Sequence, residues 1–423
     1  MVTIMAEETA YTQAATTGKY DKASGLLGKY DNVRRFWEDQ LTSTFLRPAL
    51  NKLVQRKSKL LKRIRVLDIG CGSGDGYDLI MGVNTKNPGI YDYSTAELTP
   101  DMLNAYVGVD INEELLRQAN ECYGNNSKFS FLREDLSNGF TSKIKAQDPF
   151  DLYFTSYGTL SHLHDQQCVR LIADVCRHSS DQAIFVGDWL GRYSYEWQDL
   201  WDNPVDEEYF MDYRISYIYP EAKRDHVDIA CFPLRLITKN EIMKIINEAA
   251  KESGVQIKPV TLFDRSIFIG RHIDTGDYNV NCPRLRFPVN SLFEGYVRTD
   301  IESLLVDYIP KSGFDHLNNF FEMLFMSWNT LVNHTISLLG NYDIEKCAFD
   351  SIPEILPFYP EPLKEAMETM QRLVEGVGWV QWGDVRANVI EPHLGYSLRK
   401  LEIDLQPGTG VGHGLVGIFQ ICK

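Results

Sequence analysis

The stretch RVLDIGCGSGDG at residues 65–76 decides how the rest of the chain is interpreted. Residues 66–69 are a short apolar run, which is typical of a buried strand. Glycines follow at every second position, Gly70, Gly72 and Gly74, before an amphipathic run. Glycine lets a backbone turn tightly and approach a ligand, and the start of the next helix presents free N–H groups to that ligand. The stretch therefore predicts a strand, a ligand-binding glycine turn and the start of a helix.

Two details distinguish this turn from the G-x-G-x-x-G turn of dinucleotide-binding domains. Asp68 lies inside the strand, and the glycines have the spacing G-x-G-x-G. With these details, L-D-I-G-C-G-S-G resembles motif I of the class I S-adenosylmethionine (SAM) methyltransferases, in which the turn packs against the methionine part of SAM. The resemblance implies that Asp68, Gly70, Cys71 and Gly72 bind the cofactor. An ordinary strand-to-helix turn is the alternative.

The composition is that of a globular protein with one large or two ordinary domains. The chain has 423 residues, of which 44% are hydrophobic and 24% charged. Its formal net charge of −15 disfavours a nucleic-acid partner, which normally needs a basic surface. The sequence has no apolar run of membrane-spanning length, and residues 1–20 lack the pattern of a signal peptide, so we expect a disordered tail there and no membrane partner. Eight cysteines without a C-x-x-C motif indicate neither a disulfide framework nor a zinc site, so a cytoplasmic protein without a bound metal is expected.

Residues 21–62 are expected to form a helical cap before the first strand. Asp31 can cap a helix, and Pro48 is expected to end that helix and begin a second one. The segment resembles the cap that closes over SAM in many small-molecule methyltransferases. The resemblance implies that Tyr30 and Arg34 contact the cofactor, with Arg34 as a plain surface charge as the alternative.

Two further strands are predicted to end in acidic residues. A carboxylate at Asp110 can accept hydrogen bonds from both ribose hydroxyls of an adenosyl group, although Asp110 could instead cap the next helix. Residues 129–136 alternate like a strand. The family resemblance places Asp135 at the adenine amino group, with Ile111 and Leu136 beside the cofactor.

The loop at residues 156–162 follows the expected fourth strand. Open parallel sheets place their ligands at the carboxyl ends of central strands, so Ser156 and Tyr157 are expected to contact the cofactor. His162 is a candidate general base in this loop. The alternative is a surface histidine without a chemical role.

Aromatic residues after the fifth strand are candidate substrate ligands. Trp189, Tyr193 and Trp197 stand among carboxylates, which suits a cationic or planar organic substrate. Trp379 stands beside glycines, as in the wall of an aromatic cavity. Core packing is the alternative for each of these aromatic side chains.

The expected fold class is α/β, with a Rossmann-like, doubly wound, mostly parallel seven-stranded sheet whose last strand is antiparallel. Residues 63–273 would form this domain, closed by a hairpin of residues 255–263 and 266–271. Residues 274–288 look like a linker. Residues 289–423 would form an accessory α+β domain that covers the substrate or mediates a homodimer.

The accessory region has a mixed pattern. Apolar spacing predicts helices over residues 314–339 and 362–376, and strands over residues 397–405 and 415–422. The Gly-rich loop at residues 406–414 has neither a lysine nor a following helix, so it is not a phosphate loop.

The predicted function is methyl transfer from SAM to an N or O atom, or to a C atom, of a small organic molecule, with S-adenosylhomocysteine as the product. The sulfonium is already activated, so such an enzyme mainly positions its reactants. One alternative is another enzyme on the same fold, such as an aminopropyl transferase or a nicotinamide oxidoreductase. The other is a non-catalytic interaction subunit with the SAM-binding fold.

Overall fold

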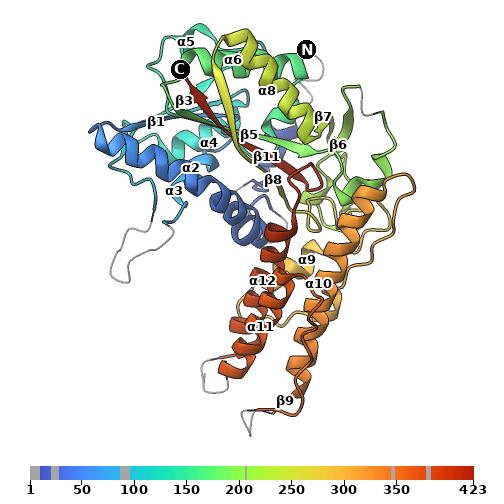
Figure 1. Ribbon diagram of the computed structural model, residues 1–423. Helices are drawn as coiled ribbons and strands as arrows, with labels where there is room; N and C mark the ends of the chain where they lie inside the picture. Colours follow the sequence, from blue (N-terminus) through green and yellow to red (C-terminus); the bar gives the residue numbers. More distant parts are fainter. Residues whose placement is uncertain (1–9, 21–27, 86–95, 205–206, 344–347, 378–382) are drawn as a thin grey trace.

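A computed structural model of the chain describes residues 10–20, 28–85, 96–204, 207–343, 348–377 and 383–423. At its centre lies a nine-stranded sheet in which the main path has the order β3-β2-β1-β4-β5-β11-β8 (Figure 1). The parallel strands of this path are β1 (Ile64–Ile69), β2 (Leu103–Asp110), β3 (Phe129–Arg133), β4 (Leu152–Phe154) and β5 (Ala183–Gly191). Beside the end of β5 lies β7 (Cys231–Ile237), which pairs antiparallel with β6 (Phe210–Arg214).

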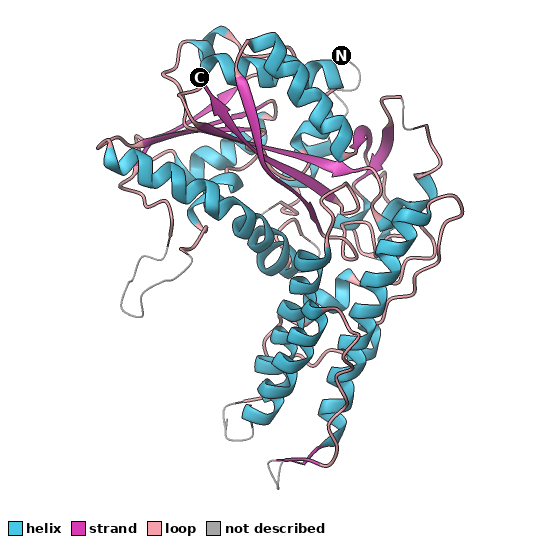
Figure 2. Cartoon of the chain, in the orientation of Figure 1, coloured by secondary structure: helices cyan, strands magenta, loops and turns pink. Residues whose placement is uncertain are grey.

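Helices cover both faces of the sheet, as the predicted doubly wound fold requires (Figure 2). One face carries α2 (Asp39–Lys59), α3 (Asp75–Met81) and α4 (Glu113–Tyr123). The other face carries α5 (Ser142–Lys145), α6 (Asp165–His178) and α8 (Lys239–Ser253). Because both faces are covered, the central strands are nearly continuous apolar runs, and every residue of β5 is buried.

The antiparallel strand of the sheet comes from the far end of the sequence. β11 (Gly414–Cys422) lies between β5 and β8 (Gln256–Arg265) and runs antiparallel to both. The expected hairpin partner, residues 266–271, is not a strand, because Ser266 takes a left-handed φ of 56° and Ile267 and Phe268 pack into a helical core instead. The antiparallel last strand is confirmed, but its predicted place in the sequence and the predicted end of the sheet at residue 273 are wrong.

Residues 266–413 are therefore an insertion between the last two strands of the main path. Its helices are α9 (Arg286–Ser291), α10 (Asp315–Asn341), α11 (Glu361–Gly376) and α12 (Glu391–Leu405), and β9 (Tyr342–Asp343) pairs with β10 (Ala348–Phe349). The three long helices α10, α11 and α12 extend away from the sheet (Figure 1). α10 and α11 confirm the predicted helices, whereas the strand predicted at residues 397–405 is wrong. Leu394, Leu398 and Leu401 are buried at helical spacing, so this segment belongs to α12.

The predicted linker at residues 274–288 is packed into the structure. Asn279 and Leu285 are buried, and the buried Arg286 donates to Asp31 at 2.7 Å. The insertion shares its core with the N-terminal cap through Trp37, which donates to Glu402 of α12 at 2.9 Å. The region therefore packs against the cap and the sheet, and its last strand, β11, is part of the main sheet.

α2 passes through Pro48, although we expected the helix to break there. A proline inside a helix costs about 3 kcal/mol or more. However, Leu41, Leu46, Leu50 and Leu53 from both halves of α2 are buried against the sheet. Burial of each such side chain stabilises by about 1.5–3 kcal/mol, which outweighs the break.

The predicted disordered tail is wrong for residues 10–20. Residues 10–16 are helical, and Ala10, Ala14 and Tyr20 are buried against the chain. Residues 1–9 lie outside the described part.

The remaining elements are short helical turns: η2 (Arg34–Glu38), η3 (Thr159–His162), η4 (Tyr195–Leu200), η5 (Ser216–Ile218), α7 (Glu221–Arg224), η6 (Ile301–Leu304) and η8 (Arg386–Ile390). Among the helices that the structure describes, none has the length and apolar character needed to cross a bilayer.

Candidate functional site

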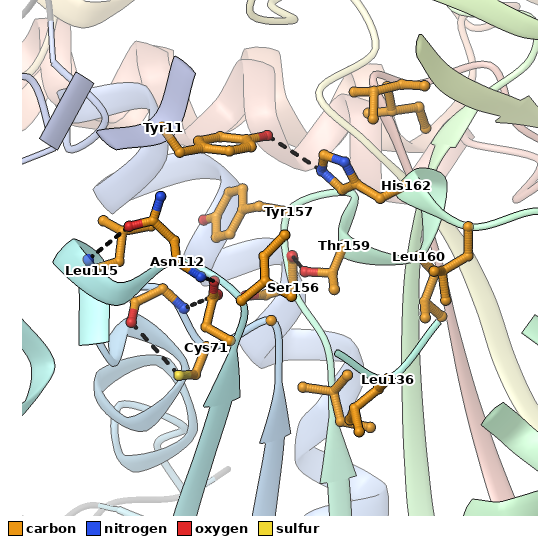
Figure 3. A pocket seen from close by; sticks show the side chains of 18 of the residues that line it. Tyr11, Cys71, Asn112, Leu115, Leu136, Ser156, Tyr157, Thr159, Leu160 and His162 are labelled. Carbon is orange, nitrogen blue, oxygen red and sulfur yellow. Dashed lines mark hydrogen bonds between the residues drawn. The ribbon is translucent and has the colours of Figure 1, made fainter. Parts of the chain in front are cut away.

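A cavity of about 510 Å³ lies at the carboxyl ends of the central strands. Each of the first four strands contributes its end or the loop behind it (Figure 3). The cavity brings together eleven residues that the sequence nominated: Arg34, Gly70, Cys71, Gly72, Asp110, Ile111, Asp135, Leu136, Ser156, Tyr157 and His162. Residues more than 120 positions apart thus line a single space, as expected at the switch point of an open α/β sheet.

The turn after β1 can be made only with glycine. Gly70, Gly72 and Gly74 have φ angles of 70°, 53° and 90°, a region that other residues rarely adopt. A Cβ atom at Gly70 would lie 2.4 Å from Thr159 Cγ2, so the loop after β4 packs directly on the turn. A Cβ atom at Gly72 would instead meet Lys29 Nζ at 3.7 Å, over the cavity floor. The bare backbone at Gly72 therefore leaves room for a ligand.

Asp110 fixes the turn from the end of β2. Its carboxylate accepts hydrogen bonds from the backbone N–H of Gly72 at 2.8 Å and of Asn112 at 2.9 Å. Asn112, not Asp110, caps α4, because its side chain accepts from Leu115 N at 3.0 Å. Burial raises the pKa of Asp110. A carboxylate can accept about four hydrogen bonds, so Asp110 retains acceptor capacity toward the cavity.

Asp135 is the second strand-end acid, and it follows β3. It is exposed at the cavity and accepts from Ser137 N at 2.8 Å, while the neighbouring Leu136 is buried in the cavity wall. An acceptor beside an apolar wall is the combination that a purine ring with an amino group requires. Asp110 and Asp135 thus lie at one cavity, at the carboxyl ends of two adjacent parallel strands.

The strand order, the helices on both faces and the one antiparallel strand of the main path make this a Rossmann-like, doubly wound fold, as the sequence predicted. Solved structures that are similar to this chain include a SAM-dependent methyltransferase from Clostridium acetobutylicum, which is 14% identical with a TM-score of 0.34 over 60% of this chain and 90% of its own. The CcbJ methyltransferase from Streptomyces caelestis is 13% identical, with a TM-score of 0.37 over 60% of this chain and 90% of its own. A SAM-dependent methyltransferase from Methanosarcina mazei is 18% identical, with a TM-score of 0.33 over 48% of this chain and 84% of its own.

No family model matches the sequence, and no curated protein is significantly similar to it.

Asp68 has a different place from the one predicted for it. Its side chain is fully buried behind the turn, accepts from the Tyr106 hydroxyl and does not line the cavity. A Cβ atom at Gly76 would lie 2.3 Å from Asp68 Oδ2, so the carboxylate packs directly against the start of α3. Burial raises the pKa of Asp68 to about 7. Asp68 therefore lies outside the cavity wall and supports the turn from behind.

Two cations lie over the glycine turn. Lys29 Nζ is 2.6 Å from Asp75 at the start of α3, and Arg34 is 3.3 Å from the same carboxylate. The guanidinium of Arg34 also lies 3.8 Å from the centroid of the Tyr157 ring and 4.5 Å from that of Tyr30. Tyr30, which was expected to contact the cofactor, does not line the cavity. Its ring instead packs against the guanidinium of Arg34. Lys29 does line the cavity, but it follows no predicted strand, so no strand-end signal marks it.

The loop after β4 is held by a buried ion pair. Asp188 in β5 accepts from Tyr157 N at 2.7 Å and Gly158 N at 3.0 Å, and it pairs with Arg265 at 2.6 Å. Tyr157 has a φ of 54°, which is strained for a residue with a side chain. The bonds from Asp188 keep this conformation and direct the Tyr157 ring toward Arg34.

His162 lines the cavity beside residues of the N-terminal segment. Its Nε2 lies 3.3 Å from the Tyr11 hydroxyl (Figure 3), and its ring stacks on Phe232 with centroids 5.8 Å apart. Tyr11 and Tyr20 come from the segment that was expected to be disordered, and both line the cavity. Sequence analysis missed them because no strand-end or loop motif marks them.

A second group of residues forms what we call the aromatic end of the cavity, defined by Tyr20, Tyr213, Tyr217, Arg271 and His413. The Tyr20 and Tyr217 side chains are hydrogen-bonded, and Arg271 lies 5.6 Å from the Tyr217 ring centroid. Burial raises the pKa of Tyr20, so it stays a neutral hydroxyl. These residues come from four scattered segments, so no local pattern in the sequence could connect them.

The predicted substrate ligands lie elsewhere. Trp189 and Trp197 are fully buried and Tyr193 is half-buried, and none of the three lines the cavity. Trp197 donates from its indole nitrogen to Gly191 O at 2.9 Å, which satisfies its one polar atom within the core. Core packing is the correct interpretation for all three. Trp379 lies outside the described residues.

Within the described part of the chain, no group of three or more His, Cys, Asp or Glu side chains is arranged to hold a metal ion.

Proposed function

We propose that the chain is a SAM-dependent methyltransferase that acts on a small organic molecule. The observation that carries this proposal is the convergence of the glycine turn, Asp110 and Asp135 on one cavity at the carboxyl edge of the sheet. When bound, SAM supplies a methyl group on a positively charged sulfur, which a nucleophile can attack directly. The task of the protein is then to bind, orient and exclude water.

The residues at hand match the parts of SAM. Asp110 has acceptor capacity for the ribose hydroxyls, and Asp135 with the apolar Leu136 suits the adenine ring. The open backbone face at Gly72 leaves room for the methionine part of SAM. Lys29 and Arg34 lie over this turn, where their positive charges can pair with the methionine carboxylate. These contacts need no movement of the sheet.

The size of the cavity supports a small acceptor. A volume of about 510 Å³ has to hold the cofactor and the acceptor together, and single drug-sized ligands already occupy about 300–1,000 Å³. Tyr20 and Tyr213 of the aromatic end pack in one cluster with Leu190 of β5. We assign the acceptor to this end.

Calorimetric titration with SAM and with S-adenosylhomocysteine tests the cofactor assignment. Asp110→Ala removes a charge-assisted pair to the ribose and should lower affinity by about 1.5–3 kcal/mol, which is roughly 10- to 150-fold. The matched control is Asp101→Ala, which removes an exposed carboxylate outside the cavity and should leave affinity unchanged. Unchanged affinity in Asp110→Ala contradicts the ribose assignment, and no binding by the unaltered chain contradicts the proposed function.

Methyl-labelled SAM incubated with the protein and metabolite pools tests turnover separately from binding. Label transfer to a small molecule is the expected result. SAM binding without any transfer would favour the non-catalytic interaction subunit, and transfer of an aminopropyl group from decarboxylated SAM would favour the other enzyme class.

A further inference from the structure

His413 is a nearly buried histidine of the cavity that is paired with a buried carboxylate. His164 also lines the cavity and lies 2.9 Å from Glu208 through its Nδ1, but its side chain is 63% exposed and that of Glu208 is 32% exposed. His413 directly precedes β11 and is fixed on both sides, because its N–H donates to Ser266 O at 2.9 Å and its carbonyl accepts from Gly191 N at 3.1 Å. Its ring is nearly buried, with 10% of the side chain exposed, and it lines the aromatic end. Its Nδ1 atom is hydrogen-bonded to Oε1 of Glu196.

Glu196 is built to orient this ring. It is 1% exposed in η4, and its second oxygen, Oε2, accepts from the backbone N–H of His272 at 2.7 Å. Gly270 leaves the space for it, since a Cβ atom there would lie 2.4 Å from Oε2. Burial by itself would raise the pKa of Glu196, but the charge and hydrogen bond of His413 hold it below its usual value. An ionised carboxylate can only accept hydrogen bonds, so Nδ1 of His413 is the nitrogen that carries the proton.

The other ring nitrogen, Nε2, is then the basic atom. Within the described part of the chain it has no hydrogen-bonding partner, and the cavity is the open space beside the ring. A carboxylate on Nδ1 fixes the orientation of the ring and leaves Nε2 as the atom that can accept a proton, which is the arrangement of a general base. The titratable groups that act on His413 from neighbouring elements are Glu196 itself, Glu38, His272 and Tyr213.

His162, the histidine that the sequence nominated, has contacts of a different kind. Its hydrogen bond is to the Tyr11 hydroxyl at 3.3 Å, and its ring face is covered by Phe232. A phenol hydroxyl does not provide the fixed negative charge that Glu196 provides for His413.

We propose that His413 is the general base of methyl transfer, that Glu196 is its positioning residue, and that the acceptor is the hydroxyl group of a planar aromatic compound. The inference rests on the proposed function. A base is needed when the nucleophile carries a proton that it must lose, which holds for a hydroxyl group but not for an amine that arrives neutral. The rings of Tyr20, Tyr213 and Tyr217 at the aromatic end favour a planar acceptor.

The step balances as follows. The acceptor oxygen forms a bond to the methyl carbon while the bond from that carbon to sulfur breaks and its electron pair stays on sulfur, which leaves neutral S-adenosylhomocysteine. The hydroxyl proton passes to His413 Nε2, and the imidazolium later releases it to water.

The first test uses 4-nitrophenol as a probe, because its ionisation is visible by absorbance. The full-length protein is saturated with S-adenosylhomocysteine and titrated with the probe at a pH below the pKa of the free phenol. We expect the absorbance of bound phenolate with the unaltered protein, about tenfold less of it with His413→Gln, and no loss with the exposed control His393→Gln. Absence of probe binding, bound phenol without phenolate, or loss of phenolate with His162→Gln instead would each overturn the inference.

The second test is turnover with methyl-labelled SAM and the same phenol. His413→Gln should lower kcat about 10²–10⁴-fold while KM for SAM stays within about threefold. Glu196→Gln keeps the shape of the side chain but loses its charge, so it should move the acidic limb of the kcat profile to lower pH. An unchanged kcat in His413→Gln, or an unshifted profile in Glu196→Gln, would overturn the corresponding assignment.

Two controls separate the failure modes. S-adenosylhomocysteine affinity should match that of the unaltered protein in every folded variant, because the substitutions lie outside the strand-end contacts, and thermal unfolding shows which variants are folded. If the unaltered protein does not bind S-adenosylhomocysteine, the proposed function fails. If it binds the product normally and His413→Gln has no effect on phenolate or kcat, only the present inference fails. Should Glu196→Gln fail to fold, His413→Gln alone still decides the identity of the base.

Discussion

Gly70 and Gly254 have the same left-handed backbone in two different surroundings. Their φ angles are 70° and 69°, but a Cβ atom at Gly70 would lie 2.4 Å from Thr159, whereas nothing lies within 4 Å of one at Gly254. The cost of backbone strain and the cost of steric overlap can therefore be measured separately. A left-handed residue with a side chain costs about 1–2 kcal/mol, and an overpacked site costs about 1–3 kcal/mol.

Gly254→Ala should accordingly lower the free energy of unfolding by about 1–2 kcal/mol. Gly70→Ala should lower it by a further 1–3 kcal/mol or so, because Thr159 and the loop after β4 must move. Urea titration of both variants measures the difference. Equal losses would show that the loop does not pack on the turn as the structure has it.

Single residues of the site were predictable where a local pattern marks them. Gly70, Gly72, Asp110 and Asp135 follow strands directly, and parallel strands necessarily bring their carboxyl ends to one edge. Asp68 shows the limit of such reasoning. It belongs to the same motif, yet its side chain points behind the turn, because successive side chains of a strand alternate between the two faces.

β11 shows a different limit at the scale of elements. Its residues were predicted to be a strand, but a strand pattern does not say which neighbour the strand pairs with. Residues 266–271 were the nearest apolar segment, yet the backbone N–H groups of Ile267 and Phe268 donate to Glu402 of α12 instead of to a strand. The pairing of β8 with β11 therefore depends on contacts across the whole insertion.

Ile418 tests this pairing. It is fully buried between β5 and β8, so Ile418→Ala should lower the free energy of unfolding by about 2–5 kcal/mol. Val260 in the neighbouring β8 is the matched control, since it is 45% exposed and its replacement by alanine should cost well under that amount. Equilibrium unfolding in urea gives both values. If the sheet were complete at residue 273, Ile418→Ala would have little effect on it, and that result would contradict the topology.

At the scale of the whole molecule, the cavity is lined by segments from near the two ends of the sequence. Tyr11 and Tyr20 come from the N-terminal segment, and His413 comes from the return of the insertion to the sheet. Tyr11 and Tyr20 lie in a segment that was expected to be a disordered tail, and His413 lies in the Gly-rich loop at residues 406–414. Their place at the cavity depends on tertiary packing of the cap, the sheet and the insertion, which no periodicity in the sequence encodes.

The same packing buries several carboxylates, and their ionisation sets the pH dependence of stability. Burial raises the pKa of Asp68 and of Glu402 to about 7 and that of Asp264 to about 6. Because these groups hold their protons more tightly in the folded chain, the stability that they contribute is complete below their unfolded pKa values, near 4, and is lost as pH rises toward 7. Glu38 and Glu196 behave in the opposite way. Burial alone would raise their pKa values, but arginine neighbours of Glu38 and His413 beside Glu196 lower them, so their contribution is lost only as pH falls below the unfolded pKa.

We therefore expect the stability contributed by Asp68, Glu402 and Asp264 to fall as the pH rises toward 7. Burial lowers the pKa values of His272, His178 and His334, so their contribution changes in the opposite direction. Glu402 accepts hydrogen bonds from Trp37 Nε1 at 2.9 Å and Phe268 N at 2.8 Å, where the cap, the sheet and the insertion meet. Replacing Glu402 by Gln removes one titrating group, so the slope of the free energy of unfolding between pH 4.5 and 7 should become more positive by up to about 1.4 kcal/mol per pH unit. The exposed Asp101→Asn changes the net charge equally and should leave the slope unchanged. Urea titrations at half-unit pH intervals measure these slopes, and a slope in Glu402→Gln equal to that of the unaltered chain would show that this carboxyl does not hold its proton in the fold.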